Sequence, residues 1–110
     1  MKLTIAEMQN EVAPWVGSNF PNDTVETATL GVTEEAGELA RAVLKRYQGI
    51  RGTFEEWTEE MRKELGDVFI KLCHVASLAG IDLEYAIADR WNEVRHRDWT
   101  TDKQGHGLPS

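Results

Sequence analysis

Two pairs of carboxylates are the part of this 110-residue sequence best suited to chemistry. Glu35 and Glu38 form the first pair, in the segment TEEAGELA at residues 33–40, and Glu64 and Asp67 form the second. Side chains three residues apart lie on the same face of an α-helix. If the two helices are consecutive and antiparallel, the pairs can meet across the interface between them.

Four carboxylates gathered in one place repel one another, and without a cation some of them would take up protons. Divalent cations remove this repulsion, because two such ions neutralise four carboxylates. The donor set is all oxygen, which favours Mg²⁺, with Mn²⁺ as a substitute, over zinc. An acidic chain can then bind a polyanionic ligand through the ions. The alternative is a solvated helix face with no ion.

The residues after the second pair favour a buried position. In the segment LGDVFIKLCHVASLAG at residues 65–80, Asp67 and Lys71 are the only charged side chains. A helix that is apolar nearly all round is buried, so its polar stripe must be satisfied inside the protein. Alternatively the stripe meets solvent and the apolar surplus contacts another subunit. Lys71 is a candidate to bind phosphate, with a structural ion pair as its alternative.

Helix start and stop signals predict one helical domain at residues 1–99. A polar tail follows at residues 100–110. The expected helices begin at Thr4, Asp23, Thr53 and Asp82. The first ends or bends near Trp15, and the others end near Tyr47, Gly80 and Asp98. No segment alternates with the period of two that is typical of strands. The sequence therefore predicts an all-α fold, an antiparallel four-helix bundle that is completed by oligomerisation, as a homodimer or homotetramer.

The fourth expected helix supplies candidate ligand-binding residues. At 100° per residue, Arg90 and Arg97 fall on the apolar face of this helix, where they need anions unless they reach solvent from its edge. Asn92 can hydrogen-bond a sugar or phosphate, or lie exposed. Trp15, beside a glycine turn, carries a ring that can stack on a nucleobase, with the core as the alternative position.

Composition limits the classes of function. The net charge of −7 argues against a duplex-DNA binder, which needs a basic face. The single cysteine, Cys73, excludes an internal disulfide and a Cys-rich zinc site. No signal peptide or membrane-spanning apolar run is evident. We therefore expect a cytoplasmic protein with no nucleic-acid or membrane partner.

The carboxylate motifs resemble a known family. The segments EEAGE at residues 34–38 and ELGD at residues 64–67 resemble the EExxE…ExxD signature of the MazG-like, all-α nucleoside triphosphate pyrophosphohydrolases. The segment RWNEVRHR at residues 90–97 is similar to a K-F-N-x-x-x-x-R pattern in the last helix of that family. The resemblance covers residues 3–98, with Arg90 where Lys is usual and His74 where many members have Asn.

The resemblance implies an activity and assigns roles. It implies that a nucleoside triphosphate is hydrolysed to the monophosphate and diphosphate, with Mg²⁺ held by Glu35, Glu38, Glu64 and Asp67. Glu34 is then a candidate to orient or deprotonate the attacking water, or to hold a water bound to the metal. The expected role is cleansing of the deoxynucleotide pool or nucleotide control. The alternatives are a phosphoribosyl-ATP pyrophosphohydrolase and a non-catalytic helical module that binds a partner.

Overall fold

The structure, a computed structural model, describes residues 2–98 and 100 and confirms the all-α class. Across these residues the chain forms four α-helices and no strand: α1 (Ile5–Asn19), α2 (Val25–Gln48), α3 (Phe54–Ala79) and α4 (Leu83–Val94). The expected polar tail lies outside the described residues except for Thr100. None of the described helices is long and apolar enough to cross a membrane.

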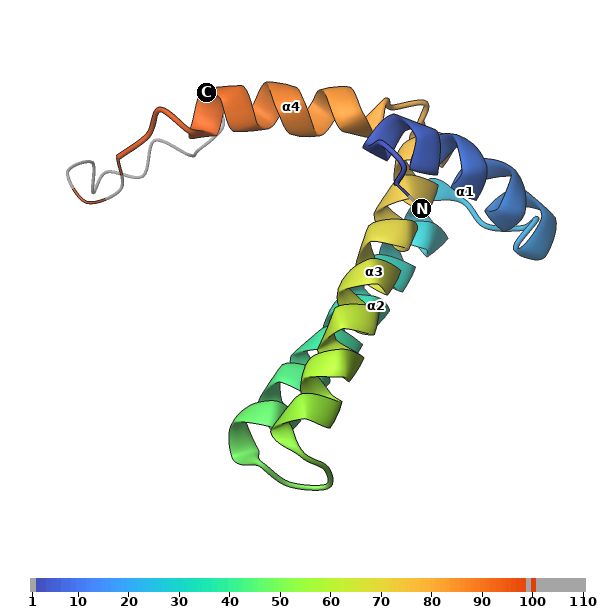
Figure 1. The fold of residues 1–110 in the computed structure, drawn as a ribbon. Helices are drawn as coiled ribbons and strands as arrows, with labels where there is room; N and C mark the ends of the chain where they lie inside the picture. The colour runs from blue at the N-terminus through green and yellow to red at the C-terminus, as the bar shows by residue number, and fades with distance from the viewer. Residues whose placement is uncertain (1, 99, 101–110) are drawn as a thin grey trace.

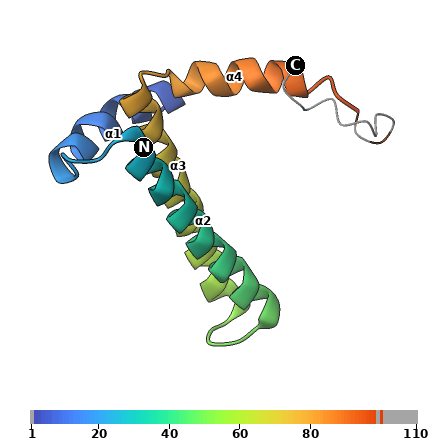
Figure 2. The same cartoon turned by 180° about the vertical axis from the view of Figure 1, so that it is seen from behind.

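The two long helices, α2 and α3, form an antiparallel hairpin (Figure 1). They lie side by side when the molecule is seen from behind as well (Figure 2). Small side chains are buried on both helices: Ala28 and Ala42 on α2, and Cys73 and Ala76 on α3. Small residues allow two helices to approach closely, so this hairpin holds the face of α2 that carries Glu35 against α3.

Local capping interactions fix most of the helix boundaries. Thr4 and Thr53 form the expected capping boxes, and Asp82 caps α4 by accepting a hydrogen bond from the Tyr85 backbone N–H. α2 begins differently from the prediction, because Thr24 is its cap instead of Asp23.

The ends of two helices also differ from the prediction. α1 does not stop near Trp15 but continues through Pro14 to Asn19. Proline removes one backbone hydrogen bond, while the extra turn places Val16 in the core. α4 ends at Val94, four residues earlier than expected, so Arg97 follows the helix instead of belonging to it.

α1 and α4 lie at the end of the hairpin remote from the α2–α3 turn and point in opposite directions (Figure 1). Gln9 of α1 ties them to the α3–α4 turn, donating to the Ile81 carbonyl (2.8 Å) and accepting from the Leu83 backbone N–H (2.9 Å). The Ala6 backbone N–H donates to Glu84 of α4 (3.1 Å). α1 therefore has a fixed position against α3, where it forms one wall of the site described below.

Many large apolar side chains of the described residues are exposed to solvent in the single chain. The buried apolar side chains among the described residues are few and mostly small, whereas many large ones are exposed. Exposed examples from three helices are Leu30, Tyr47, Leu65, Tyr85 and Trp91. The Cα radius of gyration is 16.8 Å, against about 13 Å for a compact domain of this length. The apolar surplus expected on α3 is thus present and lies partly uncovered in one chain.

Candidate functional site

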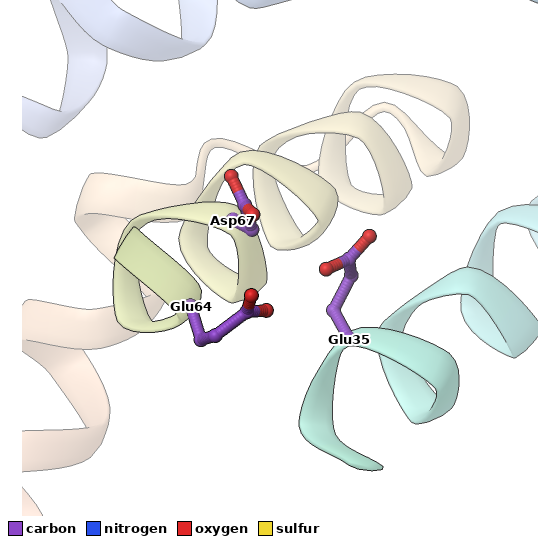
Figure 3. A group of neighbouring side chains, drawn as sticks. All are labelled: Glu35, Glu64 and Asp67. Atoms are coloured by element: carbon purple, nitrogen blue, oxygen red, sulfur yellow. The ribbon is translucent and has the colours of Figure 1, made fainter. Parts of the chain in front are cut away.

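An acidic cluster lies at the middle of the α2–α3 hairpin. Glu35 extends from α2 towards Glu64 and Asp67, which lie one turn apart on α3 (Figure 3). Each of the three residues offers a carboxylate oxygen, and these oxygens lie within 4.8 Å of one another. The structure therefore brings three of the four proposed metal ligands together from two helices.

The electrostatics of the cluster show the repulsion expected of neighbouring carboxylates. Burial, followed by the charges of Asp67 and Glu38, raises the pKa of Glu35 above its ordinary value, and the charge of Glu34 adds to this effect. Burial and the charges of Glu38 and Asp67 likewise raise the pKa of Glu64. Glu38 is exposed and outside the group of three, but its charge acts on both neighbours.

The residues present fit a hard divalent cation. Glu64 is only 6% exposed, and its Oε2 atom is buried with no hydrogen-bond partner in the described part of the chain. A buried carboxylate oxygen without a partner carries a desolvation penalty. A cation held by Glu35, Glu64 and Asp67 would satisfy that oxygen and neutralise the cluster. The all-oxygen donor set is the type that Mg²⁺ and Mn²⁺ prefer.

A pocket of about 570 Å³ opens beside the acidic cluster, within the range typical of small-molecule sites. Three of its residues, Glu35, Asp67 and Lys71, come from the α2–α3 hairpin and are charged. Its other walls are largely apolar. They are lined by Leu3, Met8, Glu11, Val12, Trp15, Val16, Phe20 and Ile70. The pocket thus joins an ionic end to an aromatic and aliphatic one.

Lys71 lies between the two ends of this pocket. Its Nζ atom lies 4.9 Å from the centre of the Phe20 ring, a cation–π distance. Gly31 of α2 lies against the lysine chain, because a Cβ atom there would make van der Waals contact with Lys71 Cδ at 3.4 Å. No ion pair of Lys71 is present among the described residues, so its ammonium group remains available to an anionic ligand.

Trp15 lines the same pocket and presents its ring to it. The side chain is 56% exposed and meets Phe20 edge-on, with ring centroids 6.1 Å apart and an interplanar angle of 74°. A face of the indole ring is therefore available for stacking. The sequence-based reasoning missed Phe20, Glu11 and Gly31. The helical spacing of Glu11 and Trp15, four residues apart, was a signal that could have revealed Glu11.

Within one chain, the structure does not bring the candidate residues of α4, or Arg97 after it, to the acidic cluster. Arg90 is 55% exposed and pairs with Glu93 (2.9 Å), which also pairs with Arg97 (3.0 Å). Asn92 is exposed as well. The predicted inward position of Arg90 is wrong for the single chain, because its side chain is largely exposed and pairs with Glu93 on the same helix. The roles of these three residues in substrate binding stay predictions.

Glu34 and His74 complete the residues singled out by the sequence. Glu34 is exposed and borders the cluster, where its charge reaches Glu35. His74 is buried on α3, 3.7 Å from Asp23 Oδ2, and its Nδ1 atom has no hydrogen-bond partner among the described residues. His74 does not line the pocket.

Comparison with known proteins identifies the family. The family model of the MazG nucleotide pyrophosphohydrolase domain matches residues 23–100, which include the acidic cluster. The chain belongs to this MazG family. Its four helices without a described strand agree with the all-α fold expected from the resemblance. Because the match begins at residue 23, the α1 wall of the pocket lies outside it.

Two curated relatives extend the comparison of this MazG protein. A protein named dATP/dGTP diphosphohydrolase, from Salmonella phage PMBT28, is 31% identical over 96 residues, which are 87% of this chain and 28% of the relative. The uncharacterized protein YpjD of Bacillus subtilis (strain 168) is 32% identical over 106 residues, 93% of this chain and 96% of the relative. This chain thus spans little more than a quarter of the phage relative. No solved structure matches.

Proposed function

We propose that this protein is a Mg²⁺-dependent nucleotide pyrophosphohydrolase, which converts a nucleoside or deoxynucleoside triphosphate and water to the monophosphate and diphosphate. The observation that carries the proposal is the acidic cluster at the edge of an aromatic-lined pocket that also holds Lys71. Membership of the MazG family supports the reaction. We further propose that it acts in the cytoplasm, in cleansing of the deoxynucleotide pool or in nucleotide control.

The residues of the hairpin would divide the work at the phosphates. Glu35, Glu64 and Asp67 would hold the metal, with Glu38 beside them as a further ligand. When bound, Mg²⁺ or Mn²⁺ supplies charge neutralisation at the phosphates and lowers the pKa of a bound water. Glu34, at the border of the cluster, is the proposed group to orient that water or accept its proton. Lys71 would bind a phosphate oxygen through a charge-assisted hydrogen bond.

The other end of the pocket fits the nucleoside. Trp15 offers an indole face beside apolar side chains, and stacking on an aromatic side chain suits every nucleobase because each has a π-face. The printed name of the phage relative refers to dATP and dGTP. Deoxynucleotides, and purine deoxynucleotides in particular, are therefore the first substrates to test on this protein.

We also propose that the working protein is a homodimer or homotetramer. The uncovered apolar side chains, among them Trp91 and Ile87 of α4, support this proposal, since a soluble monomer rarely exposes large contiguous apolar patches. In such an assembly, Arg90, Asn92 and Arg97 are candidates to reach the phosphates of a nucleotide. Light scattering at a fixed protein concentration, read against the chain mass of 12.4 kDa, tests the assembly directly.

A nucleotide panel with Mg²⁺ and with Mn²⁺ tests the proposed activity, when the monophosphate and diphosphate are measured separately. We expect Glu38→Gln to abolish the release of diphosphate. Glu59→Gln is the matched control, because Glu59 is exposed on α3 and pairs with Arg62 away from the cluster. If neither substitution changes the rate, the catalytic assignment fails. Phosphoribosyl-ATP belongs in the panel, since its preferential hydrolysis would select the alternative enzyme.

A further inference from the structure

The wall that α1 gives to the pocket carries one unexpected charge. Its lining residues recur at helical spacing, and all but Glu11 are apolar or aromatic: Met8, Glu11, Val12, Trp15 and Val16. Residues with this spacing share one face of a helix. Glu11 therefore opens onto the same pocket as the Trp15 ring, one helical turn away from it.

The carboxylate of Glu11 is exposed and makes no contact that holds the described part of the fold together. The start of α1 is capped by Thr4 and Glu7, so Glu11 has no capping role. Within the part of the chain that the structure describes, its side chain has neither an ion pair nor a hydrogen bond. Glu11 thus keeps its full capacity to accept hydrogen bonds from a ligand.

The position of Glu11 in the pocket indicates which part of a ligand it would meet. The other charged lining residues, Glu35, Asp67 and Lys71, come from α2 and α3, whereas Glu11 comes from α1 together with Trp15. If the phosphates bind at the hairpin and the face of the base stacks on Trp15, as the proposed function requires, the edge of the base comes within reach of Glu11, one turn away on the same helix. This inference rests on the proposed function for that orientation.

We propose that Glu11 makes the pocket selective for guanine. An ionised carboxylate has two acceptor oxygens and no donor, and the N1–H and 2-amino groups of guanine present two adjacent donors. The two groups can form a bidentate pair. Adenine and cytosine place an acceptor beside their amino group, and thymine and uracil flank one N–H with two carbonyl oxygens. Each of these bases leaves one carboxylate oxygen against another acceptor.

The comparison of dGTP with dITP isolates this contact, because hypoxanthine differs from guanine only by lacking the 2-amino group. A good bidentate contact to a base discriminates by about 5- to 150-fold. Since Glu11 is exposed to solvent in the free protein, we expect the protein to prefer dGTP over dITP about tenfold in kcat/KM, near the low end of that range.

Glu11→Gln is the decisive variant. A glutamine can pair with the N1–H and O6 groups that guanine and hypoxanthine share, so we expect the dGTP to dITP ratio to fall to about one. A general effect of removing one negative charge would change both nucleotides equally and leave the ratio intact. Glu26→Gln is the matched control, because Glu26 is exposed on α2 and does not line the pocket; it should keep the ratio of the unmodified protein.

Two measurements separate failure of this inference from failure of the proposed function. Hydrolysis that shows no preference for dGTP, or a preference that survives Glu11→Gln, would overturn the role of Glu11 while the enzyme assignment stands. If no nucleotide is hydrolysed, the proposed function fails. Calorimetric titration with dGTP and with dITP, using Ca²⁺ in place of Mg²⁺, then tests the inference on binding alone. A roughly tenfold higher affinity for dGTP that is lost in Glu11→Gln would support selective binding. Equal affinities of the unmodified protein for the two nucleotides would refute it.

Discussion

Gly31 provides a sharp test of the position of Lys71, because the two residues meet across the α2–α3 interface. A Cβ atom at Gly31 would lie 3.4 Å from Cδ, 3.6 Å from Cε and 3.7 Å from Nζ of Lys71. These are ordinary contact distances, so alanine should leave the lysine in place. Gly31→Ala should also raise the free energy of unfolding by about 1 kcal/mol through helix propensity, or the melting temperature by about 4–8 °C.

Valine at the same position should behave differently. Its two methyl groups extend about 1.5 Å beyond Cβ and fill two of the three staggered directions, so we expect Lys71 to be displaced from the pocket. A hydrogen bond to a charged group contributes about 1.5–3 kcal/mol. Loss of the phosphate contact of Lys71 should therefore lower kcat/KM by about 10- to 150-fold, whereas Gly31→Ala should keep it.

A double-mutant cycle with Lys71→Met completes this test. If valine acts by displacing the lysine, Gly31→Val should add little to the defect of Lys71→Met, because both changes remove the same contact. Steady-state hydrolysis of dGTP and thermal unfolding, both at one protein concentration, give the required numbers. Two results would refute the displacement of Lys71 by valine. One is that the losses in kcat/KM from Gly31→Val and Lys71→Met add up in the double variant. The other is that Gly31→Ala lowers kcat/KM as much as Gly31→Val.

Four further outcomes are expected. Mg²⁺ at about 100 times its dissociation constant should stabilise the protein by about 2.7 kcal/mol, and calorimetry of Glu64→Gln should show most of this gain lost. In the metal-free protein the raised pKa values of Glu35 and Glu64 mean that the folded state holds protons which the unfolded chain releases above the ordinary value of 4.5. Glu64→Gln should therefore have a higher melting temperature than the unmodified protein in a chelator, by a margin that grows as the pH rises above 4.5 and disappears below it. A margin that does not depend on pH would contradict this cause. Trp15→Ala should raise KM by about 5- to 150-fold, from a stacking contribution of about 1–3 kcal/mol per base, with a smaller change in kcat. Trp91→Glu should lower the mass measured by light scattering if α4 lies in an interface, and an unchanged mass would exclude α4 from it.

The features that depend on local sequence could be predicted, and those that depend on distant packing could not. Helix starts at Thr4, Thr53 and Asp82 follow from hydrogen bonds between residues three apart, so they are visible in the sequence. The start of α2 was missed because Asp23 and Thr24 are adjacent residues with similar capping ability. The end of α1 was missed because the burial of Val16 outweighs the local effect of Pro14.

The candidate site shows the same division. The meeting of Glu35 with Glu64 and Asp67 followed from their helical spacing and from an antiparallel hairpin. The contribution of α1 was only partly foreseen, through Trp15, because the angle at which α1 crosses α3 is set by contacts such as those of Gln9 with the α3–α4 turn. The placement of Arg90 failed for a related reason, since a helical wheel cannot tell which side of α4 another element covers.

The hairpin has a consequence for how the protein assembles during folding. Its contacts join segments that are close in sequence, and proteins rich in such contacts fold within microseconds to milliseconds. Capping at Thr24 and Thr53 favours both of its helices from their first turns. We therefore expect the three clustered carboxylates to meet early, before α1 and α4 dock. An ion present during synthesis would then find its proposed ligands in a half-formed chain. If the protein assembles as the proposed oligomer, the slowest step on the way to an active molecule would be the joining of completed subunits.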